Sequence, residues 1–216
     1  MKTAIARTLA AALAGALSLQ AAAQERSYTY LEAGYVAQAL EAPGDAQAAL
    51  DDIDARGGYL AGSLALGQDW FVAAGVYKGR DDVALRAAGA ELASFDLDAQ
   101  QVVLGLGYRH ALSERLDWTA ELSWLDTRLA FEHKPLALRE QSDGDDARLA
   151  LGVRGDLAPN LEAWARLRYT DGDIYDGEFG GGVGVLLKFN RLWGVSAQAE
   201  GGAGNRQYGV GVRASF

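Results

Sequence analysis

The fold is decided by the stretch Asp117-Trp118-Thr119-Ala120-Glu121-Leu122-Ser123-Trp124. Its even-numbered positions are apolar, and its odd-numbered positions are polar. Successive side chains of a β-strand point to opposite faces, so this pattern predicts a strand with one apolar face and one polar face.

The same alternation recurs along the chain. It is clear at 147–155, 161–169, 193–200 and 208–216, and weaker at 28–36, 59–66, 70–78, 98–109 and 178–189. For 70–78 the pattern leaves open which face is which. Together with 117–124, these segments predict ten strands of about 9–12 residues each.

The connections between these segments alternate in length. Short links lie at 67–69, 110–116, 156–160 and 190–191, and longer or more polar links lie at 38–56, 79–94, 127–145, 171–177 and 201–206. Short turns at one end and longer loops at the other are typical of a membrane barrel. The predicted fold is therefore an all-β, transmembrane, antiparallel up-and-down β-barrel of ten strands, with eight strands as the alternative. An even strand number places both termini on the short-turn, periplasmic side.

The composition supports this fold and excludes several others. The chain has 27 glycines among 216 residues, no cysteine and a formal net charge of −9. Glycine inside a helix costs about 1 kcal/mol relative to alanine, so the excess disfavours a helical protein, and no apolar run reaches the length of a membrane-spanning helix. The absence of cysteine excludes disulfides and thiolate metal sites, and the acidity argues against nucleic acid as a partner.

The first 23 residues have the features of a secretory signal peptide. Lys2 and Arg7 give a basic start, residues 9–19 are largely apolar, and residues 21–23 are three alanines. Small residues at that point suit signal peptidase, so we expect cleavage before Gln24. The chain is thereby divided into a signal peptide at 1–23 and an outer-membrane barrel at 24–216.

The alternation by itself does not say whether the apolar faces meet lipid or a protein core. Aromatic residues near the strand ends favour lipid, since amphipathic rings accumulate at the membrane–water interface. These residues are Tyr28, Tyr30, Trp118, Trp124, Tyr169, Phe189, Trp193, Tyr208 and Phe216. The alternative is a soluble periplasmic or secreted barrel whose apolar faces point inward and hold a small apolar ligand.

The last predicted strand ends the chain in an aromatic residue. Its apolar positions are Tyr208, Val210, Val212, Ala214 and Phe216. This ending resembles the C-terminal strand that the bacterial barrel-assembly machinery recognises, which implies that this machinery is the folding partner. Residues 28–36 resemble the first strand of small outer-membrane barrels from xanthomonad-type bacteria, and the architecture is similar to the OmpA/OmpX type. Barrels of that type often have eight strands, whereas ten are counted here.

The polar faces collect charges of both signs. They are Glu32, Arg109, Glu121, Arg148, Arg154, Glu162, Arg166, Arg168, Glu200 and Arg213. An unpaired charge shielded from water is costly, so we expect an interior network of ion pairs that fills and rigidifies the barrel. The alternative is a narrow conducting lumen whose selectivity these charges set. Glycines in the strands, such as Gly34, Gly107 and Gly184, are expected to make room for large interior neighbours.

We expect no catalytic residue, no cofactor and no bound metal. His133 falls in an expected outer loop, where an exposed histidine is far commoner than a catalytic one, and His110 falls at an expected short turn. Acidic runs at 51–54, 143–146 and 171–178 resemble fragments of calcium loops. They lack the full spacing of an EF-hand, which favours solvated loops over cation sites.

The sequence thus predicts a non-enzymatic protein of the outer membrane. Its expected role is structural, surface interaction or adhesion, with a narrow porin-like channel for ions or small solutes as the alternative. The expected partners are outer-membrane lipid, lipopolysaccharide and the barrel-assembly machinery. The chain is expected to be a monomer.

Overall fold

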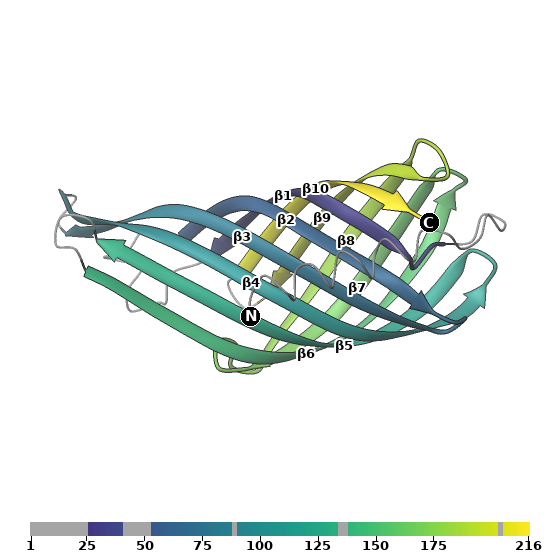
Figure 1. The fold of residues 1–216 in the computed structure, drawn as a ribbon, viewed down its shortest axis with the longest axis horizontal. Coiled ribbons are helices and arrows are strands. Elements are labelled where there is room, and N and C mark those ends of the chain that lie inside the picture. Colours follow the sequence, from purple (N-terminus) through teal and green to yellow (C-terminus); the bar gives the residue numbers. More distant parts are fainter. Residues whose placement is uncertain (1–25, 41–52, 88–89, 134–137, 203–204) are drawn as a thin grey trace, which may run out of the picture.

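The structure, a computed structural model, describes residues 26–40, 53–87, 90–133, 138–202 and 205–216. Ten antiparallel strands form a closed barrel in which β1 pairs with both β2 and β10 (Figure 1). The strands are β1 (Tyr30–Leu40), β2 (Ile53–Leu66), β3 (Trp70–Ala87), β4 (Ala90–Ser113), β5 (Leu116–His133), β6 (Leu138–Ala158), β7 (Leu161–Gly172), β8 (Glu178–Lys188), β9 (Trp193–Gly202) and β10 (Asn205–Ser215). The predicted ten-strand barrel is confirmed, and the eight-strand alternative is wrong.

The two ends of the barrel differ as expected. Tight turns at 67–69, 114–115, 159–160 and 189–192 lie at one end together with the C-terminus, which we call the turn end (Figure 1). There Phe216 N donates to Thr29 O, and Ser215 N donates to Leu192 O. Residues 1–25 and most of the expected link at 38–56 lie outside the described residues, so the signal peptide stays a prediction. No helix in the described ranges is long and apolar enough to cross a membrane.

The apolar face of each strand points outward. On β5, Trp118, Leu122 and Trp124 are exposed, whereas Asp117 and Ser123 on the opposite face are buried. The outer wall is therefore apolar around the barrel, which suits contact with lipid and is the reverse of a soluble barrel. The alternative of a soluble barrel with an apolar interior is wrong for this reason.

The segment 70–78, whose faces the sequence left open, follows the same rule. Trp70, Val72 and Val76 are exposed on the outside, while Phe71 is buried inside against the ring of Tyr28. The apolar–polar alternation of 70–78 is weak because the aromatic residue Phe71 faces the interior. Here apolar residues occupy both faces of one strand.

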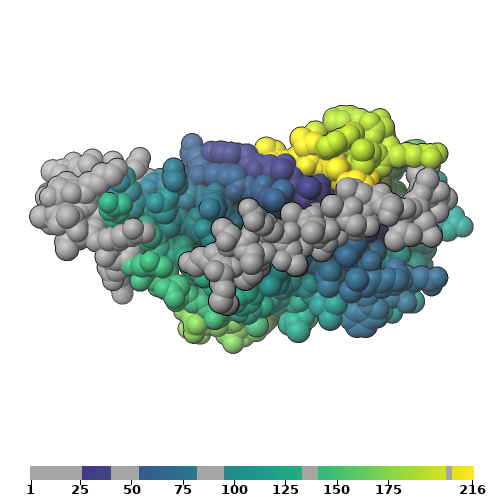
Figure 2. Space-filling view, viewed as in Figure 1, coloured from purple at the N-terminus to yellow at the C-terminus, as the bar shows by residue number. Residues whose placement is uncertain are grey.

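Four strands are much longer than predicted. β3 to β6 contain 18, 24, 18 and 21 residues, and their ends project beyond the other strands at the left of Figure 1. In Figure 2 their teal and green atoms continue past the purple and yellow atoms of β1 and β10. The expected loops at 79–94 and 127–145 are thus mostly paired strand, and His133 ends β5. Strand pairing therefore continues after the apolar alternation has stopped.

Two aromatic residues expected on the lipid face lie inside. Tyr28 is buried, and the guanidinium of Arg154 lies 4.4 Å from the centre of its ring. The ring of Tyr30 lies 4.1 Å from the guanidinium of Arg213. Both tyrosines have the same strand parity as the interior residue Glu32. Parity alone therefore already indicated that they face inward. Arginines that need partners inside the barrel favour these rings by cation–π contact.

Candidate functional site in the barrel interior

Glycines provide the space that the interior side chains occupy. Three interior glycines lie directly opposite an aromatic residue of the next strand, in the pairs Gly34–Tyr59, Gly107–Phe71 and Gly184–Trp164. In each pair a Cβ atom added to the glycine would overlap the partner's ring. The ring therefore lies flat over the glycine backbone. This confirms that glycines in the strands make room for large interior neighbours.

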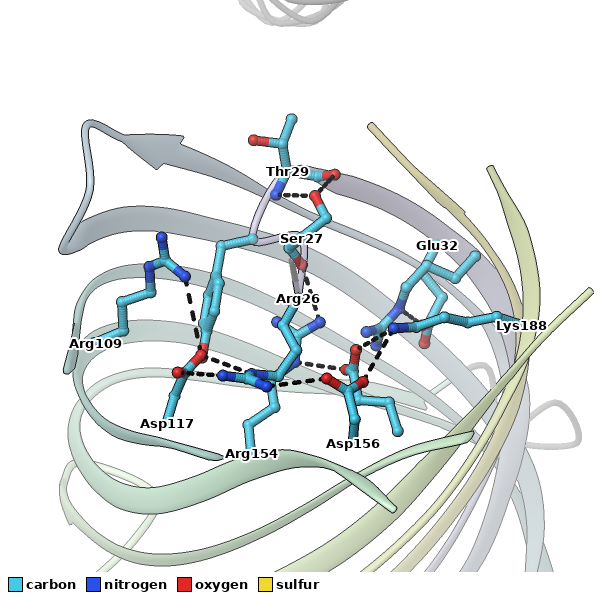
Figure 3. A network of polar contacts seen from close by, with 12 residues as sticks. Arg26, Ser27, Thr29, Glu32, Arg109, Asp117, Arg154, Asp156 and Lys188 are labelled. Atoms are coloured by element: carbon cyan, nitrogen blue, oxygen red, sulfur yellow. Dashed lines mark hydrogen bonds and ion pairs between the residues drawn. The ribbon is translucent and has the colours of Figure 1, made fainter. Parts of the chain in front are cut away.

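A group of polar side chains closes the turn end from inside (Figure 3). We call it the turn-end cluster, and it comprises Arg26, Tyr28, Arg109, Asp117, Arg154, Asp156, Glu162 and Lys188. Its members come from the segment before β1 and from β4, β5, β6, β7 and β8. The cluster therefore links strands that are distant in the sequence.

Arg26 is the hub of this cluster. Its Nε and Nη2 donate to the two carboxylate oxygens of Asp117 at 3.0 and 2.7 Å. Its Nη1 donates to Asp156 at 2.9 Å and to the carbonyl oxygen of Glu114 at 3.1 Å. Two-point arginine–carboxylate pairing is one of the stronger polar interactions in proteins. Arg26 thus fastens the chain before β1 to β5, β6 and the turn before β5.

The cluster continues through a fully buried carboxylate. Glu162 is 0% exposed; it accepts a hydrogen bond from Arg154 Nε at 2.6 Å and lies 3.2 Å from Lys188 Nζ. Lys188 also lies 3.3 Å from Asp156, which holds Arg26. The charges therefore alternate in sign along one continuous chain of contacts, as burial requires.

Tyr28 packs at the middle of the same cluster. Its hydroxyl donates to Asp117 at 3.1 Å, and its ring lies between the guanidinium groups of Arg109 and Arg154. Burial raises the pKa of Tyr28 to about 12, so the phenol keeps the proton that it donates. The hydrogen bond with Asp117 raises the pKa of Arg26 above its ordinary value, so Arg26 stays charged.

A second set of pairs lies nearer the centre of the barrel. Glu32 accepts hydrogen bonds from the hydroxyl of Tyr59 and from Arg213 Nε, each at 2.6 Å. Glu200 receives one arginine on each carboxylate oxygen, Arg166 on Oε1 and Arg168 on Oε2. Both carboxylates are thereby saturated by donors from other strands.

Apolar side chains fill further interior positions. Val36, Phe71, Leu97, Leu125 and Leu186 point inward and are buried. A cavity of about 150 Å³ remains among the central side chains, and its lining includes Tyr77, Glu121 and Arg166. The described interior therefore combines buried apolar side chains with polar groups that are mostly paired with one another.

The structure places all the predicted interior charges on the inward face and joins most of them. The pairs are Glu32 with Arg213, Arg154 with Glu162, Glu200 with Arg166 and Arg168, and Arg109 at 3.9 Å from Asp117. Within the described residues Glu121 and Arg148 form no ion pair. Glu121 instead accepts a hydrogen bond from Ser123 at 2.7 Å, and Arg148 donates to Thr170 at 3.1 Å.

Five members of the turn-end cluster were not predicted from the sequence: Tyr28, which was expected on the lipid face, and four charged residues. Asp117 and Lys188 lie on polar faces, so strand parity alone would have found them. Asp156 was assigned to a turn, whereas β6 runs through it to Ala158 with a register shift. Arg26 precedes the first strand, where no periodicity indicates which way a side chain points.

The acidic runs serve mainly as hydrogen-bond acceptors for a loop. One carboxylate oxygen of Asp146 accepts the backbone N–H groups of Ile174 and Tyr175 at 3.0 and 3.1 Å, and Asp173 accepts that of Asp145 at 3.1 Å. These bonds fix the loop between β7 and β8. In the part of the chain that the structure describes, no group of three or more acidic or histidine side chains is arranged to hold a metal ion.

Comparison with known proteins gives one family and a set of similar folds. Residues 9–216 match the model of a family described as the outer membrane protein beta-barrel domain. A search of curated proteins finds no match.

Three solved structures illustrate the likeness. The β domain of the Bordetella autotransporter BrkA has a TM-score of 0.55 and 14% identity, covering 87% of this chain and 99% of that one. The translocator domain of the autotransporter NalP from Neisseria meningitidis has a TM-score of 0.51 and 12% identity, covering 100% and 97%. The attachment invasion locus protein Ail of Yersinia pestis has a TM-score of 0.45 and 16% identity, covering 87% and 99%. At these identities the likeness concerns the fold alone.

Proposed function

The chain belongs to the outer membrane protein beta-barrel domain family, and on this premise we propose that it is a closed, non-enzymatic anchor that presents a β-sheet at the cell surface for interaction or adhesion. The observation that carries the proposal is the extension of β3 to β6 beyond the apolar wall. Because outer-membrane barrels keep short turns on the periplasmic side, we assign the projecting end to the outside of the cell.

The projecting sheet begins where the outer wall becomes polar. On β3 the exposed Val76 is followed on the same face by Lys78 and Arg80. From there β4 continues for about 40 Å along the strand, at roughly 3.3 Å per residue. Such a length of paired strand is not needed to span a membrane, which supports a role outside it.

The sheet offers a free strand edge to a partner. β6 pairs with β5 up to Leu138, but its pairing with β7 ends at Asp146. Within the described residues, the part of β6 from Leu138 to Gly144 therefore has only one neighbouring strand. An open edge presents unpaired N–H and C=O groups, which can accept an extended segment of another protein.

The test removes the β5–β6 half of the projection, which carries the free edge of β6, and keeps the barrel. Arg128 and Asp143 are cross-strand partners, so residues 129–142 can be replaced by an Asn-Gly turn that joins them. Cells that display the trimmed chain are expected to lose retention on surfaces coated with collagen, fibronectin, mucin or polysaccharide, whereas cells with the full chain bind at least one. Heat-modifiable migration on gels verifies that the trimmed barrel has folded. Equal retention of both cell types, or retention by neither, would contradict the proposal.

A narrow channel is the second candidate, and one observation favours it. Arg148, Arg166 and Arg168 lie together around Glu200, which gives the lumen there more cations than anions. A lumen that opens there would select anions. Single-channel recording in planar bilayers separates the candidates: current steps whose anion preference falls in Arg148→Ala support a channel, and folded protein without current supports the closed anchor.

The barrel-assembly machinery and lipopolysaccharide remain proposed partners. The C-terminal strand supports the first, because Tyr208, Val210 and Val212 are exposed on the outer wall and Phe216 ends the chain.

A further inference from the structure

A cationic groove crosses the outer wall of the barrel just above the apolar band. It has a volume of about 510 Å³ and spans β2 to β6. We call it the wall groove, and its charged lining residues are Arg56, Lys78, Arg80, Asp98 and Arg128. These residues are exposed and share strand parity with the outward-facing Leu60, Val76, Leu104 and Trp124. The groove is therefore on the outside of the barrel, separate from the interior charges.

The wall groove lies at the level expected for lipid headgroups. Among the β3 residues whose side chains the structure describes, the last exposed apolar one is Val76, and the next outward position is Lys78. Two residues along a strand span about 7 Å. On β5 the exposed Trp124 precedes Arg128 on the same face, and tryptophan marks the membrane–water interface. The cations are thus directly above the hydrocarbon region.

The cations of the groove are held only by exposed or partly exposed ion pairs, and one of them has no ion pair within the described residues. Four cationic side chains and one carboxylate line it, in a chain with a net charge of −9. Arg56 and Arg80 are direct cross-strand partners, an arrangement that repulsion destabilises. Arg56 lies 4.0 Å from Asp54, Arg80 lies 2.7 Å from Asp98 and Arg128 lies 3.1 Å from Asp126. The arginines of these pairs are about half to mostly exposed, so a phosphate can compete with the carboxylates. Lys78 has no hydrogen-bond or ion-pair partner among the described residues. An anionic ligand between these strands would remove the repulsion.

The floor of the groove is open backbone. Gly58 occupies the outward position between Arg56 and Leu60, and it is exposed. A Cβ atom added there would meet only the carbonyl oxygen of Gly34, at an ordinary 3.7 Å. A ligand can therefore approach the sheet closely at this point, and a side chain placed there would fill the groove without disturbing the fold.

We propose that the wall groove binds the phosphorylated sugar headgroup of lipopolysaccharide in the outer leaflet. Its phosphate groups would lie between Arg56, Lys78 and Arg80, with Arg128 beside them, and its acyl chains would run down the apolar wall below. Arginine and lysine are the side chains that pair with phosphate oxygens. This site lies at the base of the projecting sheet, and it depends neither on whether that sheet binds a surface nor on whether the lumen conducts.

The test measures lipid binding by the folded barrel. The refolded chain from Gln24 is titrated with bis-phosphorylated lipid A, with dephosphorylated lipid A and with phosphatidylglycerol, and binding is followed by native mass spectrometry. We expect bis-phosphorylated lipid A to bind most tightly. One cation near an anionic membrane surface contributes about 1 kcal/mol, so Lys78→Ala should weaken binding about fivefold. The double variant Lys78→Glu, Arg128→Glu should abolish it.

Two further variants separate the site from general charge. Gly58→Leu leaves the charge unchanged but fills the floor, so it should weaken binding of bis-phosphorylated lipid A. Arg191→Glu alters an exposed cation at the turn end and should leave binding unchanged. Heat-modifiable migration shows that each variant is folded. Equal binding of dephosphorylated lipid A or phosphatidylglycerol by the wild type, or unchanged binding in the double variant, would overturn the proposal.

Discussion

At the scale of single residues, the interior is governed by the cost of burying charge. Glu162 is fully buried and accepts from Arg154 while lying beside Lys188. Replacing both members of such a pair with apolar groups can be neutral, whereas removing one member leaves an uncompensated charge. The network therefore makes each of its members sensitive to substitution.

The first prediction concerns this carboxylate. Glu162→Gln keeps the shape of the side chain but leaves the buried Arg154 without its anion and Lys188 with Asp156 alone, so the free energy of unfolding should fall by about 3–5 kcal/mol. Urea unfolding in lipid vesicles, followed by tryptophan fluorescence, measures the change. The control is Asp98→Asn, which breaks an ion pair whose side chains are 86% and 62% exposed. It should cost less than about 1 kcal/mol, and an equal effect of both substitutions would contradict the role given to burial.

At the scale of strands, interior aromatic side chains are accommodated by glycines that lie opposite them on the neighbouring strand. Gly184 on β8 lies opposite Trp164 on β7, and the indole ring occupies the space where a Cβ atom would be. Gly184→Ala should therefore force the ring aside and destabilise the barrel by about 1–3 kcal/mol. The matched control is Gly58→Ala, where the added Cβ atom meets only the carbonyl oxygen of Gly34, at an ordinary 3.7 Å. Unfolding in lipid vesicles measures both variants. Equal stability of the two would contradict the prediction and show that the Trp164 ring is free to move.

The C-terminal strand allows recognition to be distinguished from stability. Phe216 is 41% exposed on the outer wall, and its contribution to the ladder is made by its backbone N–H and carbonyl groups. Phe216→Ala keeps these groups, so we expect refolding in detergent to be nearly unchanged. If the barrel-assembly machinery recognises the ring of Phe216, the amount of folded Phe216→Ala protein in the outer membrane of cells should fall severalfold. A similar loss in both measurements would place the effect in stability instead.

At the scale of the whole molecule, the turn-end cluster connects parts that the strand ladder leaves separate. Arg26 reaches Asp117 and Asp156, which lie 91 and 130 residues further along the chain. The ladder joins only neighbouring strands, whereas this contact crosses the barrel. The segment before β1 therefore acts as an internal brace that also closes the turn end.

This brace gives the last prediction. Arg26→Ala leaves the buried Asp117 with Tyr28 and a more distant Arg109, so the free energy of unfolding should fall by about 3–5 kcal/mol. Hydrogen exchange should also become faster at the start of β5 and the end of β6. Arg115→Ala, at an exposed arginine of the turn before β5, serves as the control and should change neither measurement. Unchanged exchange in Arg26→Ala would show that the brace is dispensable.

Strand number, pairing order and the outward direction of the apolar face followed from the sequence. The reason is that the membrane imposes a strict period of two wherever lipid meets one face, as in 117–124. The same parity identified Arg154, Glu162, Arg166 and Glu200 as interior residues. The true ends of β3 to β6 did not follow, because strand pairing continues there after the apolar period has ended.

The sequence by itself determined the closed ten-strand barrel and the faces of its strands, since these depend on local alternation and on turn spacing. Only the tertiary structure decided which charges meet. Strand tilt and register bring Glu200 to Arg166 and Arg168, and the chain before β1 folds inward to place Arg26 on Asp117. The tertiary structure also brings Arg56, Lys78, Arg80 and Arg128 onto one patch of the outer wall. Periodicity fixes the face on which a side chain lies, whereas its neighbours on that face are fixed by how the closed sheet is staggered.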